Sequence, residues 1–135
     1  MKVILASKNQ HKLTELSAIL SQLGFEIALD IDVEETGTTF EENSFLKADA
    51  VMKASGLPVL ADDSGLMVDA LDGAPGVYSA RYGHKASDKE RTAYLLENMK
   101  DVPEGKRGAK FVCVITCLFP DGRKIVARGE CPGVI

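Results

Sequence analysis

The apolar positions of this chain form first a short continuous run and then a repeat with the period of a helix. Residues 2–6 form a compact apolar run, which predicts a strand. Leucines then recur every three or four positions between residues 13 and 23, which predicts a helix, and Gly24 predicts its end. Residues 25–31 predict a second strand. The chain therefore opens on a strand, a helix and a strand.

Two further helices are predicted by capping boxes, in which a Ser or Thr side chain accepts a hydrogen bond from the backbone three residues on. The first box, at residues 39–42, predicts a helix that runs to Gly56. The second box, at residues 87–90, predicts a helix that ends near Met99.

The remaining apolar runs predict strands joined by turns. Residues 58–61 predict a short buried strand that ends in a turn at residues 62–65, and residues 66–71 predict a strand that returns from it. Residues 109–119 are almost continuously apolar, which predicts a central strand covered on both faces, and residues 124–130 predict its hairpin partner. Strands that alternate with helices predict a layered α/β fold, and the hairpins make its sheet mixed.

The composition indicates one ordinary globular domain over residues 1–135, with 45% hydrophobic and 27% charged residues. The formal net charge is −4 and no basic patch dominates, which argues against nonspecific binding to DNA or RNA. The apolar stretch within residues 1–6 is too short for a signal peptide or a membrane helix. We therefore expect a cytoplasmic protein with neither a nucleic acid nor a membrane as partner.

The three cysteines favour free thiols. Cys113 and Cys117 share a face of the predicted strand but lie ~13 Å apart along it, too far to form a disulfide. Cys131 follows later, and the absence of a Cys-x-x-Cys pair argues against a zinc site. Buried free thiols are consistent with a reducing compartment.

Three polar clusters lie at the ends of predicted elements. The first is the turn between the first strand and the first helix: Ser7, Lys8, Asn9, Gln10, His11 and Lys12. Such a turn aims backbone N–H groups at one point, and a helix N-terminus favours an anion there. We interpret the turn as a phosphate-binding turn, and a solvated polar turn is the plainer alternative.

The second cluster is an acidic loop at residues 34–37, which precedes the helix predicted at residue 39. Glu42 is explained by its capping box, and a solvated acidic loop with favourable helix charges would explain most of the rest. Glu34 and Lys47 are the charges that this interpretation leaves least explained.

The third cluster, Asp62 and Asp63 followed by Ser64 and Gly65, gives the strongest indication of function. Two like charges beside a buried strand are costly unless something compensates them. A divalent cation would do so, and Mg²⁺ prefers oxygen ligands and often joins carboxylates to substrate phosphates. A plain turn, in which an Asp caps the backbone, remains the alternative. No P-loop signature is present, and no G-x-G-x-x-G follows the first strand.

Taken in order, these clusters resemble a known family. SKNQHK at residues 7–12 resembles its [ST]-x-N-x-x-K signature, and EETGTTFEENSFLKA at residues 34–48 resembles its acidic loop and following helix. ADDSGLMVDALDGAPGVYSARY at residues 61–82 resembles its most diagnostic stretch, and KDVP at 100–103 and CPGVI at 131–135 also agree. The chain is similar along essentially its whole length to the inosine triphosphatase (Ham1) family.

The resemblance implies a three-layer α/β fold with a long mixed sheet flanked by helices, usually as a homodimer. It implies Mg²⁺-dependent hydrolysis of deaminated purine nucleoside triphosphates to the monophosphate and pyrophosphate. Asp63 would be the catalytic carboxylate and, with Glu34, a metal ligand, and Glu35 lies close by in the sequence. The residues that would contact the substrate are Ser7, Lys8, Asn9, Gln10, His11, Lys12, Lys47 and Ser64.

Family members continue for several tens of residues beyond the position of Ile135. That part carries a Phe-Gly-Tyr-Asp motif, a lysine and a Ser-His-Arg motif that recognise the purine, and none of them follows here. We therefore expect this chain to lack the C-terminal part of the family fold and to be catalytically negligible by itself. Two alternatives stay open: a Maf-type pyrophosphatase, whose Arg-rich first turn is absent here, and a noncatalytic nucleotide-binding module.

Overall fold

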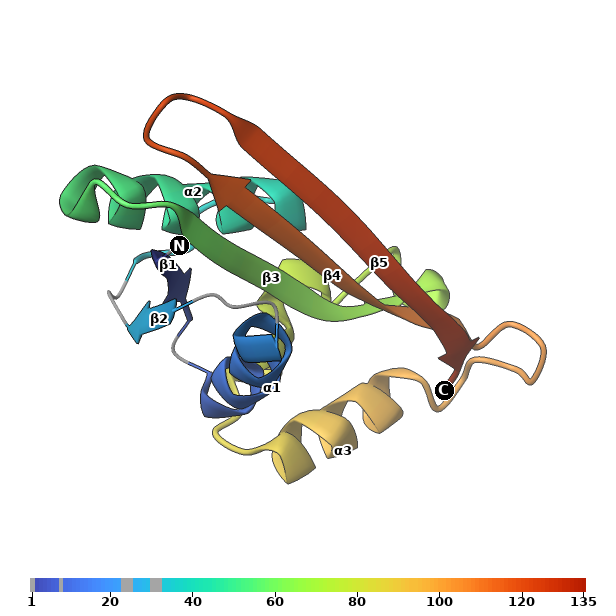
Figure 1. Ribbon diagram of the computed structural model, residues 1–135. Helices are drawn as coiled ribbons and strands as arrows, with labels where there is room; N and C mark the ends of the chain where they lie inside the picture. The colour runs from blue at the N-terminus through green and yellow to red at the C-terminus, as the bar shows by residue number, and fades with distance from the viewer. Residues whose placement is uncertain (1, 8, 23–25, 30–32) are drawn as a thin grey trace. The chain divides into compact units, whose positions relative to one another are not determined.

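The structure is a computed structural model, and it describes residues 2–7, 9–22, 26–29 and 33–135 (Figure 1). It contains two compact units, one of Met1–Asp63 with Val114–Arg128 and one of Ser64–Cys113 with Gly129–Ile135. The single domain expected over residues 1–135 stays a prediction. No helix in the described ranges is long and apolar enough to cross a membrane.

Five strands form one mixed sheet, as predicted. They are β1 (Lys2–Ala6), β2 (Glu26–Leu29), β3 (Val59–Val68), β4 (Gly108–Leu118) and β5 (Lys124–Val134). Their order is β2-β1-β3-β4-β5, and β1 pairs in parallel with both β2 and β3. β4 and β5 form the predicted hairpin, closed where the N–H of Phe119 donates to the carbonyl of Arg123 at 3.0 Å. β2 lies inside the strand predicted at residues 25–31, of which 25, 30 and 31 lie outside the described residues, as does Gly24.

The helices are α1 (Gln10–Gln22), α2 (Phe40–Ser55) and α3 (Asp88–Asn98), with 3₁₀ turns η1 (Asp69–Leu71) and η2 (Gly76–His84). Both predicted N-caps are confirmed, although the glutamate of each box accepts from the N–H of the residue before the cap, Thr38 at 2.8 Å and Ala86 at 3.1 Å. Thr39 Oγ1 accepts from the N–H of Glu42 at 3.1 Å, and Ser87 Oγ accepts from the N–H of Glu90 at 3.2 Å. Gly56 ends α2 in the left-handed conformation at φ 68°, which glycine adopts without strain.

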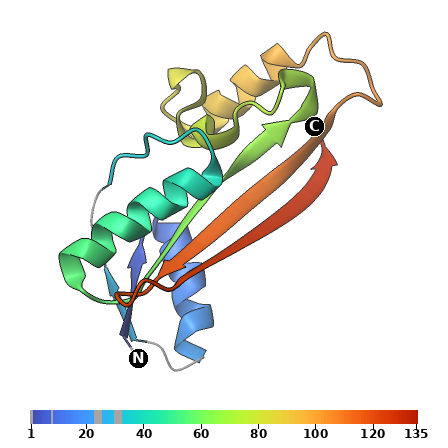
Figure 2. The ribbon, with the colours of Figure 1, turned by 90° about the horizontal axis from the view of Figure 1, so that it is seen from above.

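In the first unit, α1 and α2 cover opposite faces of the strands (Figures 1 and 2). Ala48 and Val51 of α2 pack in one buried cluster with alternate residues of β1 and β3, which are Ile4, Ala6, Val59 and Ala61. The intervening residues Val3 and Leu60 point to the other face, where they line an apolar cavity of about 290 Å³ together with Leu20 of α1.

In the second unit, α3 packs on the ends of β3 and β4. Its core contains Val68, Leu95, Met99 and Ala109. Arg107 stabilises the segment that follows α3, because its guanidinium donates to the carbonyls of Met99 at 2.8 Å and Val102 at 2.9 Å.

The turn predicted at residues 62–65 is wrong. β3 runs unbroken from Val59 to Val68, and η1 replaces the rest of the strand predicted to return through residue 71. The sequence suggested a turn at Asp62 and Asp63 because burying charged carboxylates inside a strand costs free energy. Here both are buried within β3 beside lysine side chains, so the extended backbone is retained.

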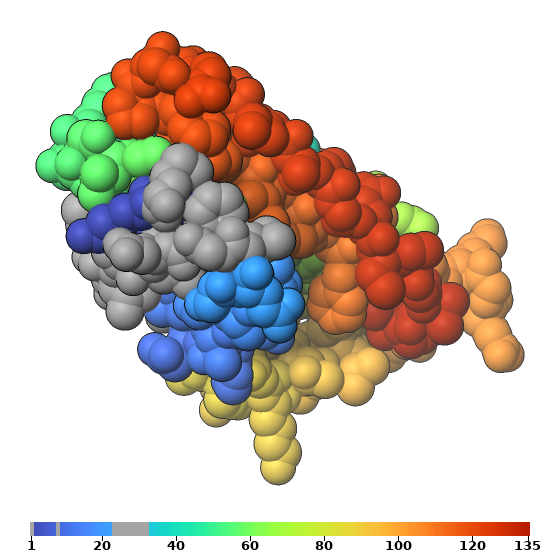
Figure 3. Space-filling model, in the orientation of Figure 1, coloured from blue at the N-terminus to red at the C-terminus, as the bar shows by residue number. Residues whose placement is uncertain are grey.

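The prediction that the strand at residues 109–119 is covered on both faces is also wrong. From Val112 to Leu118, buried side chains of β4 alternate with half-buried ones, and Phe111 is 63% exposed. β5 is exposed along its whole length and is visible in red at the surface in Figure 3. Apolar character alone does not distinguish a strand covered on two faces from one covered on a single face.

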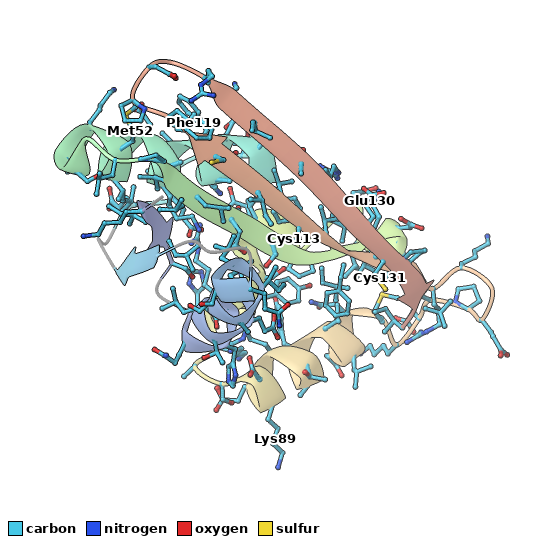
Figure 4. The ribbon with its side chains drawn as sticks, in the orientation of Figure 1. Met52, Lys89, Cys113, Phe119, Glu130 and Cys131 are labelled. Carbon is cyan, nitrogen blue, oxygen red and sulfur yellow. The ribbon has the colours of Figure 1, made fainter. Side chains whose placement is uncertain are left out.

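No disulfide joins the three cysteines in the described part of the chain, and their side chains are less buried than expected. Cys113 and Cys117 are half-buried on the less covered face of β4, and Cys131 on β5 is exposed (Figure 4). Burial nevertheless raises the pKa of the Cys117 thiol, which keeps it in the unreactive protonated form.

Candidate active site

Strand pairing brings the first and third polar clusters together. β1 runs parallel to β3 with Ala6 opposite Ala61. Ser7 follows Ala6 in the chain, and Asp62 and Asp63 follow Ala61. Ser7 therefore lies at the same end of the strand pair as the two aspartates. The carboxyl ends of parallel strands are the usual location of ligand sites in α/β sheets.

The turn after β1 is organised by its own short polar side chains. Ser7 Oγ accepts from the N–H of Asn9 at 3.1 Å. Asn9 Oδ1 accepts from the N–H groups of His11 at 3.0 Å and Lys12 at 3.2 Å, so Asn9 caps the start of α1. These bonds fix the direction in which α1 leaves the sheet and hence where Lys12 projects.

The other predicted residues of this turn are less informative. Gln10 and His11 are exposed, and Lys8 lies outside the described residues. Their assignment to the substrate stays a prediction.

Asp62 and Asp63 lie on opposite faces of β3, because successive side chains of a strand alternate. Asp62 points to the α1 side, where its Oδ2 pairs with Lys12 Nζ at 2.8 Å. Asp63 points, like Ala61, to the α2 side. Both are almost completely buried, at 3% and 5% exposure. The two carboxylates therefore face different helices, Asp62 toward α1 and Asp63 toward α2.

Asp63 has the most strongly perturbed carboxyl group among the described residues. Burial raises its pKa from 3.8 to about 6, and the nearby carboxylate of Glu35 adds to the rise. Lys47, Asn43 and Lys12 lower the pKa without cancelling these effects. A buried acid that titrates close to neutrality is typical of groups that exchange protons or bind cations.

The acidic loop contributes Glu35 to this environment. Glu35 Oε1 pairs with Lys47 Nζ at 2.9 Å, and the Lys47 side chain is only 12% exposed. Glu34 is exposed, and no contact among the described residues joins it to Asp63. The structure thus brings Glu35 to Asp63, and the role of Glu34 as a metal ligand stays a prediction.

Three buried polar atoms lack a hydrogen-bond partner within the described part of the chain: Asp62 Oδ1, Asp63 Oδ2 and Asn43 Nδ2. Buried polar groups are rarely left unpaired, so such atoms often mark the place of a ligand, an ion or water. Mg²⁺ is commonly held by one or two carboxylates and completes its shell with water and phosphate. Asp63 and a glutamate of the acidic loop fit that donor set, although no three His, Cys, Asp or Glu residues cluster in the described ranges.

Ser64, the last predicted substrate contact, follows Asp63 in β3 and is half-buried. It belongs to the second compact unit, so its contribution stays a prediction.

Three residues of the site were not predicted as such: Glu35, Asn43 and Asp62. Asp62 was visible in the acidic pair, but its partner Lys12 could be recognised only from the strand pairing. Asn43 gave no indication in the sequence, because an asparagine in the first turn of a helix is ordinary. Its contacts depend on how the loop folds back onto α2.

The fold and the site define an α/β protein with a buried carboxylate flanked by lysines at the carboxyl end of a parallel strand pair. The Ham1 family model matches residues 3–135, and the chain belongs to this family. It is 49% identical over 142 residues to the dITP/XTP pyrophosphatase of Escherichia coli (strain K12), covering 99% of this chain and 72% of that protein. This match sets aside the Maf-type alternative.

Solved structures agree with the sequence match. A nucleoside-triphosphatase / dITP/XTP pyrophosphatase from Mycobacterium abscessus superposes with a TM-score of 0.85 at 42% identity, covering all of this chain and 74% of that one. A HAM1 protein from Coxiella burnetii superposes with a TM-score of 0.90 at 39% identity, covering all of this chain and 73% of that one. The predicted family and its α/β fold with a mixed sheet are confirmed.

Proposed function

We propose that this protein hydrolyses deaminated purine nucleoside triphosphates, such as dITP, ITP and XTP, to the nucleoside monophosphate and pyrophosphate. The observation that carries the proposal is the buried carboxylate of Asp63, which has an unpartnered oxygen and lies under the influence of Lys12 and Lys47. The activity named for the similar bacterial enzymes supports the choice of substrate. The biological role is to remove these nucleotides before they enter DNA or RNA.

In the proposed reaction, water attacks the α-phosphorus and the bond from that phosphorus to the bridging oxygen of the β-phosphate breaks. Asp63 holds the attacking water and accepts its proton, a role suited to a carboxyl group with a pKa of about 6. Lys12 and Lys47 bind the phosphates and stabilise the charge that develops on the departing pyrophosphate. Ser7 and Asn9 shape the turn that receives the triphosphate.

Mg²⁺ is the proposed cofactor, and when bound it would neutralise phosphate charge and favour the departure of pyrophosphate. Asp63 would hold it, together with Glu35 or Glu34 from the acidic loop. Because Glu35 is paired with Lys47, engaging Glu35 would free the Lys47 ammonium for a phosphate.

We further propose that the protein is a cytoplasmic homodimer. Its cysteines form no disulfide within the described residues, which suits a reducing compartment. The exposed apolar side chains of Ile125 and Val126 on β5 are a surface that self-association would bury.

The test is pyrophosphate release from dITP, with dATP as the matched purine control. Because the chain spans 72% of the Escherichia coli relative, this and the later turnover measurements use a chimera that adds, after Ile135, the part of that relative that follows its match to this chain. Release should require Mg²⁺, stop on chelation and be faster with dITP. Orthophosphate as the product would contradict attack at the α-phosphorus. Nucleotide binding without any release would instead indicate a noncatalytic binding module.

A further inference from the structure

Asn43 is a polar residue in an unusual place. It lies in the first turn of α2 and is completely buried, at 0% exposure. Its Oδ1 accepts a short hydrogen bond from the backbone N–H of Gly37 at 2.7 Å, while its Nδ2 has no partner in the described part of the chain. The amide oxygen of Asn43 is therefore hydrogen-bonded to the acidic loop, and its NH₂ group is available for another contact.

The bond to Gly37 fixes which way the amide points. A backbone N–H can be accepted only by the oxygen of the amide, so the NH₂ group must occupy the other side. That side faces Asp63, since a side-chain hydrogen bond from Asn43 is one of the causes that lower the pKa of the Asp63 carboxyl. Asp63 Oδ2 is itself buried and unpartnered. The NH₂ group of Asn43 therefore interacts with the Asp63 carboxylate without the full geometry of a hydrogen bond.

The acidic loop approaches α2 too closely to accept a side chain at this point. A Cβ on Gly37 would lie 2.7 Å from Asn43 Oδ1 and 2.7 Å from Glu42 Cβ. A Cβ atom essentially never approaches another heavy atom this closely, so the loop can lie here only because residue 37 is glycine. The same loop carries Glu35, two residues before Gly37, whose carboxylate pairs with Lys47 of α2. The loop is therefore fixed to α2 at both positions.

We propose that Asn43 is a positioning residue that holds the acidic loop and the catalytic carboxylate of Asp63 in one geometry. Its oxygen anchors the loop at Gly37, and its NH₂ group orients the Asp63 carboxylate. The inference rests on the proposed function for the reaction that this geometry serves. The amide of Asn43 offers an acceptor and a donor on two separate atoms, whereas a carboxylate would place a second negative charge beside Asp63 and an apolar side chain would release the loop.

Two substitutions separate the two contacts. Asn43→Asp keeps an oxygen for Gly37 but removes the donor toward Asp63. Asn43→Ala removes both. Asn98→Asp is the matched control, because it makes the same chemical change at an exposed asparagine of α3 in the second unit. Each variant is compared with the unmodified chain by circular dichroism and thermal denaturation before further measurement.

The first readout is hydrogen exchange of the Gly37 amide, measured by NMR without nucleotide or metal. Asn43→Ala should raise the exchange rate at least ~10-fold, because the amide loses its acceptor. Asn43→Asp and Asn98→Asp should leave it close to that of the unmodified chain. An unchanged Gly37 exchange rate in folded Asn43→Ala would overturn the anchoring role.

The second readout is kinetic. Asn43→Asp should lower kcat for dITP by ~10–100-fold, the usual effect of losing a group that orients a metal-binding or catalytic side chain. KM should change by less than ~3-fold, because the phosphate-binding lysines are untouched. Asn98→Asp should keep both constants. A wild-type kcat in Asn43→Asp would overturn the orienting role while leaving the proposed function intact.

The third readout does not depend on turnover and therefore separates this inference from the proposed function. Direct titration of the chain with Mg²⁺ alone should show affinity ~10–100-fold weaker in Asn43→Ala. If Asn43→Ala does not fold, Gly37→Ala tests the same contact from the loop, where the added methyl group should displace Glu35 and weaken Mg²⁺ binding. Mg²⁺ affinity equal to that of the unmodified chain in the folded variants would contradict the inference even if no nucleotide were hydrolysed.

Discussion

At the scale of single residues, the site depends on a carboxylate whose charge is only partly compensated. Asp63 is buried next to Glu35, and the lysines nearby do not restore its pKa to that of an exposed aspartate. Such a group gains much from a cation, and this is why we assign it both the metal and the proton of the attacking water.

Asp63→Asn should remove this function while preserving the fold. The amide has nearly the same shape but neither binds Mg²⁺ strongly nor accepts a proton, so kcat for dITP should fall at least ~100-fold. Steady-state pyrophosphate release measures the loss, and circular dichroism checks the fold. Asp72→Asn, on the η1 turn of the second unit, is a control expected to keep activity. Normal turnover in Asp63→Asn would show that Asp63 has only a structural role.

The raised pKa of Asp63 also predicts a pH dependence of stability. Because the pKa is about 6 in the folded chain and near 3.8 in the unfolded one, the folded state holds the proton more tightly. This contribution is complete below pH 3.8 and is lost as the pH rises through 6. At about 1.36 kcal/mol per pKa unit, the loss is at most about 3 kcal/mol.

Metal-free wild type should therefore become less stable relative to Asp63→Asn between pH 4 and 7, as measured by urea denaturation. Addition of Mg²⁺ at pH 7 should restore part of the wild-type stability and leave the variant unchanged. A stability difference that does not vary with pH would indicate that Asp63 titrates normally.

At the scale of elements, local sequence rules succeeded where the interactions are local. Both capping boxes, the strand at residues 2–6 and the helix ends at Gly56 and Met99 were predicted, because each depends on residues within one helical turn or one strand. The turn at residues 62–65 failed for the opposite reason. Whether Asp62 can remain in a strand is decided by Lys12, some fifty positions away.

The cap of α2 provides a test at this scale. Thr39→Ala removes the acceptor for the N–H of Glu42 and should cost about 1 kcal/mol of unfolding free energy. Ser87→Ala does the same to α3 and should cost a similar amount. Because Thr39 is next to the acidic loop, only Thr39→Ala should also weaken Mg²⁺ binding. Equal effects of both substitutions on Mg²⁺ binding would contradict a link between this cap and the site.

At the scale of the whole molecule, the sequence predicted the mixed α/β fold but not the strand order. Alternating strands and helices indicate the class, while the position of β1 between β2 and β3 follows from pairing between distant segments. The exposure of β5 was likewise not predicted, because it depends on which distant segments pack against the hairpin.

β5 is an edge strand of the sheet, and its apolar side chains Ile125, Val126 and Val134 are exposed. Exposed edges with apolar residues favour association between copies. Ile125→Lys should therefore shift the chain toward monomer, as measured by light scattering over a range of concentrations. The control is Lys124→Arg, which keeps the positive charge next to Ile125 and should leave the mass unchanged. A chain that is monomeric at all concentrations without substitution would exclude this surface as a site of association.

The pairing of Ala6 with Ala61 has a consequence for how this protein can change in length. Deleting or inserting one residue between Val59 and Ala61 would exchange the faces of Asp62 and Asp63, so that each carboxylate would meet the helix that now serves the other. No single substitution elsewhere could restore the original surroundings of both carboxylates, because Lys12 lies on α1 and Lys47 lies on α2. Length variation among descendants of this sequence is therefore confined to turns such as residues 120–123, while the stretch from Val59 to Asp63 can change its side chains but not its number of residues.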